Sequence, residues 1–405
     1  MKKLKKREIY LDNAAATPLD FQIKKIMLPY LAEEYGNPSS VHKKGIKAKK
    51  AVAEARQKTA RILRCRPEEI IFTAGGTESV NLAILGAARE HAGWENGCLG
   101  HIIISSIEHP AVSQAADFLE KGGFAITRVE ADKYGFIDPQ KIKKALRENT
   151  ILVSVIYANN EFGTIQPIAE IGKMVEKAKR ENGLPYFHTD ACQAAGALDL
   201  HTDRLRADMI SLNGGKIYGP KGSGCLYKKK GVKIRPLVFG GGQENGWRAG
   251  TENTAGIAGF AAALELAEKL KTKENKRLVE LRDYFIKKLL DEIPLAILNG
   301  HPRNRLPNNI NISIPGLHGE TAVVYLSEKG IYCSTGSACS SSDPEPSAAL
   351  RALGKTLRKA KSSLRFSLGR KTTKADLDYV LRILPEVMEK IIPPSRYRSE
   401  RIKNY

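Results

Sequence analysis

Short apolar runs alternate with longer segments of helical periodicity over the first two thirds of the chain. The runs are four to six residues long and mostly apolar, as is typical of strands buried on both faces of a sheet. The turn and capping residues Thr77 and Pro110 predict that helices begin near them and continue to about residues 90 and 121. The predicted strands cover residues 70–73, 101–105, 125–129, 151–156, 186–189, 209–212 and 224–227.

The pattern changes near residue 270. A charged helix over 271–292 leads to a strand at 309–314, a further helix, a loop rich in Ser and Gly, a strand at 363–367 and a last helix from Thr373. Strands separated by helical segments predict an α/β fold with a mainly parallel seven-stranded sheet. The part after residue 270 predicts a second, smaller α+β domain.

Composition places the chain among large globular proteins. It has 405 residues, of which 42% are hydrophobic, so it can bury a sizeable core and is not disordered as a whole. The most apolar stretch, residues 255–267, is interrupted by Glu265 and is too short to span a membrane. Acidic and polar residues follow the basic first residues where a signal peptide would be apolar. We expect a cytoplasmic protein.

The net charge is high, because 65 Lys and Arg outnumber 44 Asp and Glu and give +21. Such a surface attracts anions, including RNA. The basic residues are spread along the chain and are not interleaved with stacking aromatic residues. Direct nucleic-acid binding is therefore not the expected function.

Six cysteines are scattered along the chain without a CxxC pair. The sequence therefore predicts neither a zinc site nor a disulfide framework, and a reducing compartment fits it. Five of the thiols have the neighbours of small core residues. The exception is Cys339, in the Ser/Gly-rich loop. The six positions are 65, 98, 192, 225, 333 and 339.

Polar residues follow five of the predicted strands, at the sheet edge where open α/β sheets bind ligands. The glycine-rich turn at 73–78 supplies backbone N–H groups at a helix N-terminus, and such an arrangement can bind phosphate. Taken singly, each of these segments also fits an ordinary turn. The other four segments are 108–110, 159–161, 188–193 and 211–222.

Two of these segments carry residues suited to pyridoxal phosphate (PLP). Asp190 ends an apolar strand, and a buried carboxylate needs a partner such as a pyridinium nitrogen to stay ionised. Lys216 lies in a glycine-rich segment, where an amine can approach the cofactor aldehyde and form a Schiff base. An Asp at the ring nitrogen and a Lys on the aldehyde are what this cofactor requires of a protein.

The chain resembles the cysteine desulfurases of the NifS/IscS type, in the class-V branch of fold-type I PLP enzymes. The resemblance covers nearly the whole chain, except the basic first residues and the tail after about residue 391. Besides the five segments above, it is carried by Tyr10-Leu-Asp-Asn-Ala-Ala-Ala-Thr-Pro18, Gly36-Asn-Pro-Ser-Ser-Val-His42, Gly240-Gly-Gly-Gln-Glu244, Arg248-Ala-Gly-Thr251, Gly336-Ser-Ala-Cys339 and Ser363-Leu-Arg-Phe-Ser-Leu-Gly369.

The resemblance implies a homodimer that converts L-cysteine to L-alanine and passes the sulfur, through an enzyme persulfide, to an acceptor protein. That acceptor would be an iron–sulfur scaffold or a tRNA-thiolation enzyme. It also implies a large PLP-binding domain over residues 17–270 and a small domain made of residues 1–16 and 271–405. The small domain would carry the catalytic Cys loop at about 334–345.

The resemblance assigns five residues to the cofactor ring. Lys216 would form the Schiff base and later remove the α-proton, and Asp190 would pair with the ring nitrogen. Gln193 and Asn160 would hydrogen-bond the ring hydroxyl. His109 would stack on the ring and help to move protons.

Five further residues would serve the phosphate, the substrate and the sulfur. Gly76 and Thr77 would bind the phosphate, together with Thr251 of the neighbouring subunit. Arg365, with Asn160, would bind the substrate, and its guanidinium suits the carboxylate. Cys339 would be the nucleophile. Its loop has no other core-forming residue, which suits a mobile sulfur carrier.

The chain departs from the family at two places. Where the family usually has Ser-x-His before the Schiff-base Lys, this chain has Asn213 and Gly215, so the phosphate would lose an imidazole donor. The tail over 393–405 does not resemble the one with which IscS-type enzymes contact an iron–sulfur scaffold.

Three alternatives to cysteine desulfurase stay open from the sequence. One is a selenocysteine lyase, and another is a different class-V lyase or aminotransferase. The third is a non-catalytic homologue that binds RNA or assists assembly, which the net charge and the missing His motivate. The loop with Cys339 argues against an aminotransferase, which needs no thiol.

Overall fold

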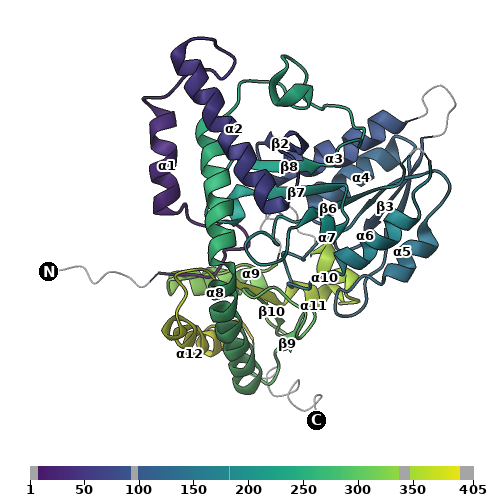
Figure 1. Ribbon diagram of the computed structural model, residues 1–405. Coiled ribbons are helices and arrows are strands. Elements are labelled where there is room, and N and C mark those ends of the chain that lie inside the picture. Colours follow the sequence, from purple (N-terminus) through teal and green to yellow (C-terminus); the bar gives the residue numbers. More distant parts are fainter. Residues whose placement is uncertain (1–7, 93–98, 182, 337–346, 393–405) are drawn as a thin grey trace.

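The computed structural model describes residues 8–92, 99–181, 183–336 and 347–392. A large sheet flanked by helices forms the upper part of the molecule in Figure 1, and smaller sheets with their own helices form the lower part. Cys339 and the tail at 393–405 lie outside the described residues.

The large sheet has seven strands in the order β2-β8-β7-β6-β5-β3-β4. Five of them pair in parallel, whereas β8 is antiparallel to both of its neighbours. The predicted α/β fold with a mainly parallel seven-stranded sheet is therefore confirmed. The strands are β2 (Ile70–Thr73), β3 (His101–Ser105), β4 (Ala125–Val129), β5 (Thr150–Ser154), β6 (Tyr186–Asp190), β7 (Met209–Asn213) and β8 (Gly224–Lys228).

Helices cover both faces of this sheet, and a hydrophobic core lies on each side. Neighbouring residues of one strand enter opposite cores: Ile103 packs on one side, and Ile102 and Ile104 on the other. This alternation explains the uninterrupted apolar runs. One core takes in α3 (Gly76–His91) and α4 (Pro110–Lys121). The other takes in α2 (Lys43–Leu63), α5 (Pro139–Ala145), α6 (Ile168–Lys177), α7 (Thr202–Leu205) and the first half of α8 (Thr254–Glu292).

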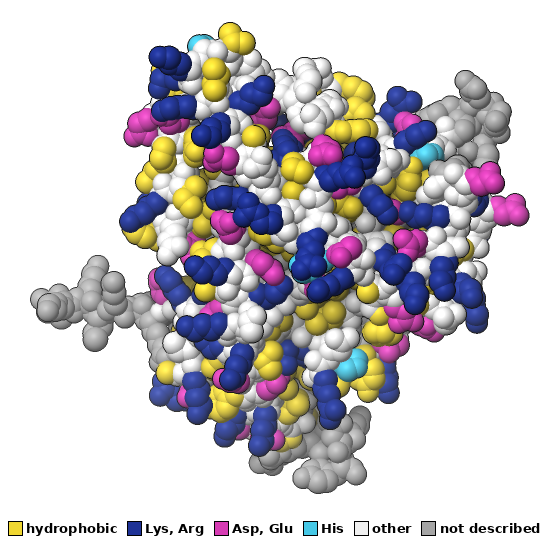
Figure 2. All heavy atoms as spheres, in the orientation of Figure 1, with side chains coloured by type: hydrophobic (Ala, Val, Ile, Leu, Met, Phe, Trp, Pro, Cys, Tyr) yellow, Lys and Arg dark blue, Asp and Glu magenta, His cyan; other side chains and the backbone are white. Residues whose placement is uncertain are grey.

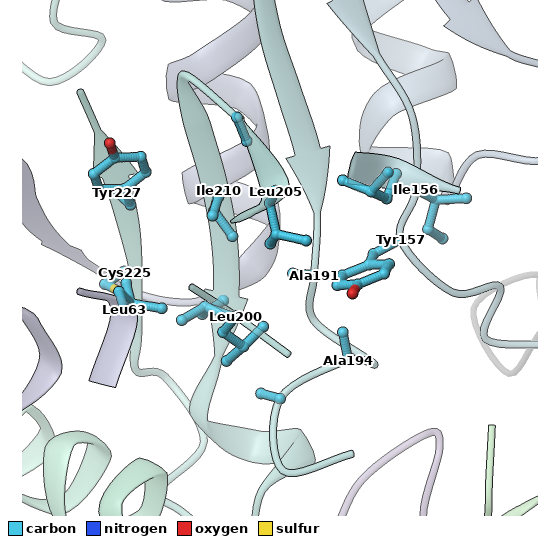
Figure 3. Close-up of a cluster of buried hydrophobic side chains, with 14 of the residues drawn as sticks. Leu63, Ile156, Tyr157, Ala191, Ala194, Leu200, Leu205, Ile210, Cys225 and Tyr227 are labelled. Atoms are coloured by element: carbon cyan, nitrogen blue, oxygen red, sulfur yellow. The ribbon is translucent and has the colours of Figure 1, made fainter. Parts of the chain in front are cut away.

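Figure 3 shows the part of this second core that supports the loops after β5 and β6. Ile156 and Tyr157 come from the first loop, and Ala191 and Ala194 from the second. The backbone N–H of Tyr157 donates to the carbonyl of Asp190 over 2.9 Å. The two loops are therefore joined to each other and to the core beneath them.

A separate hydrophobic core lies in the lower part of the molecule. It combines Ile9 and Leu11 with the second half of α8 and with strands and helices from the last hundred residues. The small sheets are β12-β10-β9 and β1-β11. The elements are β1 (Ile9–Tyr10), β9 (Ile297–Leu298), β10 (Asn309–Ser313), α9 (Gly319–Glu328), β11 (Ile331–Tyr332), α10 (Ala348–Ala352), α11 (Leu357–Lys361), β12 (Ser363–Ser367) and α12 (Lys374–Ile391).

The predicted domain boundary near residue 270 stays a prediction. The charged helix predicted from residue 271 is the second half of α8, which begins at Thr254. Its first half is the Gly/Ala-rich stretch, packed in the upper core, and its second half contributes Phe285 and Leu289 to the lower one. One continuous helix therefore crosses the predicted boundary.

Two local expectations differ from the structure. Gly75, and not Thr77, is the N-cap of α3, and it has no side chain to accept a hydrogen bond from the first turn. Cys65 is only partly buried, whereas Cys192, Cys225 and Cys333 are core thiols as expected. Among the described helices, none is long and apolar enough to cross a membrane.

The segment between β8 and α8 carries an unusual backbone that a buried ion pair stabilises. Glu244 and Asn245, in η3 (Gln243–Gly246), have positive φ angles of 47° and 56°, which cost free energy in residues other than glycine. The Glu244 carboxylate accepts two hydrogen bonds from Arg56 over 2.9 and 2.7 Å and one from the Phe72 N–H over 2.8 Å. Its side chain is 3% exposed, so these donors replace water.

We expect Glu244→Ala to destabilise the fold by about 3–5 kcal/mol, because it leaves the Arg56 charge partly buried without its partner. The matched control is Glu54→Ala, which removes the carboxylate of an exposed pair with Lys50 at 3.9 Å and should cost less than about 0.5 kcal/mol. Urea unfolding of the two variants measures the difference. Equal losses would show that Glu244 does not anchor the segment.

Candidate functional site

The loops after the strands of the large sheet meet around a cavity of about 200 Å³. A more open hollow of about 670 Å³ adjoins it and shares Ala15, Gly76, Thr77, Asn213 and Lys216 with its lining. Most of the residues singled out from the sequence line the cavity itself: Gly76, Thr77, His109, Asn160, Asp190, Gln193, Asn213, Lys216 and Arg365.

Three of the predicted residues do not line the cavity. Gly215 lines only the adjoining hollow. Thr251 is exposed and lies in neither lining of its own chain. Cys339 lies outside the described residues. The structure therefore brings together the predicted ring and substrate residues, but it does not place Thr251 with them.

Lys216 ends the short helix η2 (Gly214–Lys216) directly after β7. Its ammonium group donates to the backbone carbonyl of Ala14 over 2.8 Å and also to that of Ala15. Gln193 donates to the same Ala14 carbonyl over 2.9 Å. The segment around Ala14 therefore orients both side chains at the edge of the cavity.

Asp190 is the last residue of β6 and is 6% exposed. One of its oxygens accepts a hydrogen bond from the Cys192 N–H over 2.9 Å. Burial and the nearby Asp190 charge raise the pKa of the Cys192 thiol well above its usual range. Cys192 is thus a neutral packing residue, while Asp190 presents a carboxylate to the cavity.

His109 is the N-cap of α4, and its Nδ1 accepts a hydrogen bond from the Ala111 N–H over 3.1 Å. Because Nδ1 accepts, the neutral ring carries its proton on Nε2. Burial lowers the pKa of His109, although the Asp190 carboxylate opposes that shift. A neutral imidazole in this cavity can stack on a planar ring and exchange a proton.

Gly75 and Gly76 bring the N-terminus of α3 to the open hollow. A Cβ atom on Gly76 would lie 2.5 Å from the Cys192 sulfur, so a larger residue would not fit. Gly75 has a φ of +147°, and it leaves the N–H groups of the first turn without a side-chain cap. A helix start of this kind is a site for an anion.

The two departures from the family pattern lie beside this anion site. The Asn213 side chain accepts from the Gly215 N–H over 2.9 Å, so part of its hydrogen-bonding capacity is used locally. Gly215 does not have a positive φ, and a Cβ there would meet nothing nearer than 3.4 Å. Lys221 lines the same hollow and donates to the Thr17 carbonyl over 3.2 Å. It adds a positive charge that the sequence analysis did not assign.

Arg365 lies on β12, a strand of the lower part of the molecule, and it contributes to the cavity lining. It is 1% exposed, and its Nη2 donates to the Asp12 carboxylate over 2.7 Å. Its Nη1 donates to the carbonyls of Asn160 and Gly336. The sequence analysis missed Asp12, although the residue belongs to the Tyr10–Pro18 motif, because nothing in the sequence pairs it with a residue 353 positions away.

Glu108, next to His109, was also missed. One oxygen of this buried carboxyl accepts from the Ile156 N–H over 2.7 Å and from the Ser105 hydroxyl, which ties the loop after β3 to the loop after β5. Within the described part of the chain, the other oxygen has no hydrogen-bond partner. Burial raises the pKa of Glu108 to about 8. The residue is therefore protonated near neutral pH.

The described residues fit PLP by charge and shape. The N-terminus of α3, which has no side-chain cap, and the positive charge of Lys221 can bind the phosphate of PLP. The Asp190 carboxylate can pair with a protonated ring nitrogen. Lys216 lies between these two places, lining both the cavity and the hollow. No group of three or more metal-ligating side chains occurs in the described ranges.

Comparisons with known proteins agree with this arrangement. Residues 9–380 match the class-V aminotransferase family. The chain is 49% identical over 396 residues to "Cysteine desulfurase IscS" of Dictyoglomus turgidum, a match that covers 98% of each chain. It is 46% identical to "Cysteine desulfurase IscS" of Methanosarcina thermophila, with 97% of this chain and 96% of the relative covered.

Two solved structures extend the comparison. A "NIFS-LIKE PROTEIN" superposes with a TM-score of 0.87 at 34% identity, covering 95% of this chain and all of the other. "SspA in complex with cysteine" superposes with a TM-score of 0.76 at 35% identity, covering 89% of this chain and 98% of the other. The expected resemblance and fold are confirmed.

The Glu108 carboxyl predicts a specific dependence of stability on pH. Its pKa in the folded protein, about 8, lies above the ordinary value of 4.5, so the folded state binds this proton more tightly than the unfolded state. Between those two values the free energy of unfolding should fall as pH rises, by about 1.4 kcal/mol per pH unit. Glu108→Gln removes that dependence.

Urea unfolding of Glu108→Gln and wild type at pH 5, 6, 7 and 8 checks this. The variant should become progressively more stable relative to wild type as pH rises, whereas the exposed control Glu148→Gln should not. Parallel pH profiles for wild type and Glu108→Gln would contradict the expectation.

Proposed function

The chain belongs to the class-V aminotransferase family and is a PLP-dependent cysteine desulfurase, and we propose that it collects the sulfur of L-cysteine on Cys339. L-cysteine and the Cys339 thiol give L-alanine and a Cys339 persulfide, so that one sulfur atom is transferred and no external oxidant is needed. The observation that carries the residue assignment is the convergence of Lys216, Asp190 and Arg365 on one cavity.

Each cavity residue has a task in that reaction. Bound PLP supplies an electron sink that allows the Cα–H bond of the substrate to break. Lys216 would hold the cofactor aldehyde through its amine, and that amine, when free, would accept the α-proton of the substrate. Asp190 would keep the ring nitrogen protonated, and His109 would stack on the ring and return a proton to the product. Gln193 and Asn160 orient the ring hydroxyl.

Further residues bind the phosphate of the cofactor and the carboxylate of the substrate. Gly76 and Thr77, at the start of α3, bind the phosphate together with Asn213, Gly215 and Lys221. Arg365 binds the carboxylate of L-cysteine, and Asn160, whose backbone carbonyl accepts from Arg365 over 3.1 Å, is in the same lining.

The ends of the segment that carries Cys339 support its assignment as the nucleophile. The last described residue before it, Gly336, accepts a hydrogen bond from Arg365. The first described residue after it, Ser347, donates to the carboxyl of Glu161, which follows Asn160. Both attachment points therefore lie next to residues of the cavity lining, where the thiol has to meet the substrate.

A homodimer explains both the exposed Thr251 and an exposed apolar surface. Large apolar side chains lie uncovered around α1 (Phe21–Leu31) and in the segment between β8 and α8, and yellow side chains gather near α1 in Figure 2. Covering this surface with a second copy, as two-fold dimers do, would bring Thr251 to the partner's phosphate. The side chains are Phe21, Leu28, Leu31, Tyr35, Val41, Val238 and Phe239.

The acceptor of the sulfur is a protein of iron–sulfur cluster assembly or of tRNA thiolation. Lys and Arg cover much of the face in Figure 2 without forming one separate patch, which fits electrostatic attraction of acidic partners. A cytoplasmic location fits the free thiols in the described part of the chain, which are Cys65, Cys192, Cys225 and Cys333.

Lys216→Ala should abolish the visible absorbance of covalently bound PLP and lower alanine formation from L-cysteine by about 10²–10⁴-fold or more, because the variant loses both the attachment and the base. Lys221→Ala is the matched control, since this Lys lines the same hollow. It should keep the absorbance and borohydride trapping, with weaker cofactor binding. Borohydride-trapped cofactor on Lys221 in the wild type would overturn the assignment.

Cys339→Ser should retain the cofactor absorbance and its change on adding L-cysteine, while persulfide formation stops, because a hydroxyl cannot take up the sulfur as a persulfide. Mass spectrometry of the protein after incubation with L-cysteine detects the persulfide, and Cys65→Ser should form it normally. A persulfide on Cys192 or Cys333 of the wild type would show that the nucleophile is a different thiol.

A further inference from the structure

Arg365 is bound by a carboxylate of its own chain in the place where the substrate carboxylate is expected. Its Nη2 donates to Asp12 over 2.7 Å, and the Asp12 side chain is 19% exposed against 1% for Arg365. Arg365 nevertheless reaches the lining of the cavity together with His109 and Asp190. A substrate carboxylate would therefore meet a guanidinium that already has an anionic partner.

The hydrogen bonds of Arg365 indicate where a second carboxylate could bind. A guanidinium has five N–H donors. Nη1 uses its two on the carbonyls of Asn160 and Gly336, and Nη2 uses one on Asp12. Nε is itself buried, and among the described residues it has no acceptor. Nε and Nη2 share one edge of the plane, the edge suited to a bidentate carboxylate, and Asp12 already binds at Nη2.

Among the described residues, a second carboxyl near Arg365 is that of Glu161. It is buried, and burial raises its pKa, which favours the neutral form, although Arg365 opposes this shift. It accepts a hydrogen bond from Ser347 and is not bonded to Arg365. Asp12 is thus the carboxylate that neutralises the guanidinium directly.

The Asp12–Arg365 pair is not needed to fix the segment that carries Asp12. The residues on either side of Asp12 form their own hydrogen bonds to β12, independent of Arg365. The Ser367 N–H donates to the Leu11 carbonyl over 2.7 Å, Asn13 donates to the Ser367 carbonyl over 2.9 Å, and the Ala14 N–H donates to the Ser367 hydroxyl over 2.9 Å. The pair therefore acts mainly on the charge and orientation of Arg365.

We propose that Asp12 is a specificity-determining residue that competes with the carboxylate of L-cysteine for Arg365. The inference rests on the proposed role of Arg365 in substrate binding. Asp12 orients the guanidinium and neutralises it before substrate binds, so that simple anions bind weakly. An amino acid binds because its amine and side chain add contacts that a simple anion lacks. The competition lowers the affinity of Arg365 for any carboxylate, and it thereby increases the selectivity for amino acids over simple carboxylates.

Asp12→Asn tests the proposal, because it keeps the size of the side chain and removes the charge. The KM for L-cysteine should fall by about threefold or more, the scale of coupling between groups that share one partner, with a smaller change in kcat. Inhibition by propionate, a carboxylate without an amine, should strengthen by a larger factor.

Asp20→Asn is the matched control. Asp20 pairs with Arg370 over 3.1 Å, with similar partial exposure, and neither residue lines the cavity. The control should change neither KM nor propionate inhibition. A KM that rises or stays the same in Asp12→Asn would show that Asp12 only holds Arg365 in place, and it would overturn the proposal.

A second readout does not depend on turnover. Propionate should raise the melting temperature of cofactor-free Asp12→Asn more than that of cofactor-free wild type, because binding to the folded state stabilises it. Equal shifts would also overturn the proposal. Failure of the proposed function looks different, since the wild type itself would then form no alanine from L-cysteine.

Discussion

The site depends on residues 11–17, which are hydrogen-bonded to both halves of the molecule. On one side, the Thr17 N–H donates to the Gly215 carbonyl over 2.9 Å, and Lys216 and Gln193 donate to Ala14. On the other side, the segment is bonded to Ser367 and Arg365 of β12. The residues proposed to bind the cofactor and those proposed to bind the substrate therefore share one support, and most of its bonds use backbone atoms.

Much of the fold could be predicted from the sequence, because strands buried on both faces are uninterrupted apolar runs. The predicted bounds of β3, β4 and α4 agree with the structure, and Asp190 at the end of β6 and Lys216 just after β7 line the cavity as expected. The direction of β8 could not be predicted, since an apolar run has the same appearance in either direction. The continuity of α8 was missed because its two halves differ in composition.

The site was predictable where one residue in one loop has one task, and not where two distant residues act together. Asp190 ends an apolar strand, and that position alone suggested its chemistry. The bonds of Glu108 to Ile156 and of Asp12 to Arg365 depend on how strands and loops pack, and no local pattern records them. Resemblance to a family supplied roles for single residues, whereas these pairs became visible only in three dimensions.

Helix α8 also limits how the two halves can move. Its 39 residues make a rod of about 58 Å that is packed into the upper core at one end and the lower core at the other. Residues 11–17 form a second connection between the same halves at the cavity. A wide hinge opening between the two halves is disfavoured, because it would bend helix α8 and break the hydrogen bonds of residues 11–17. Entry of the substrate and release of the product should therefore depend on small displacements of loops, which are faster than movements of whole domains.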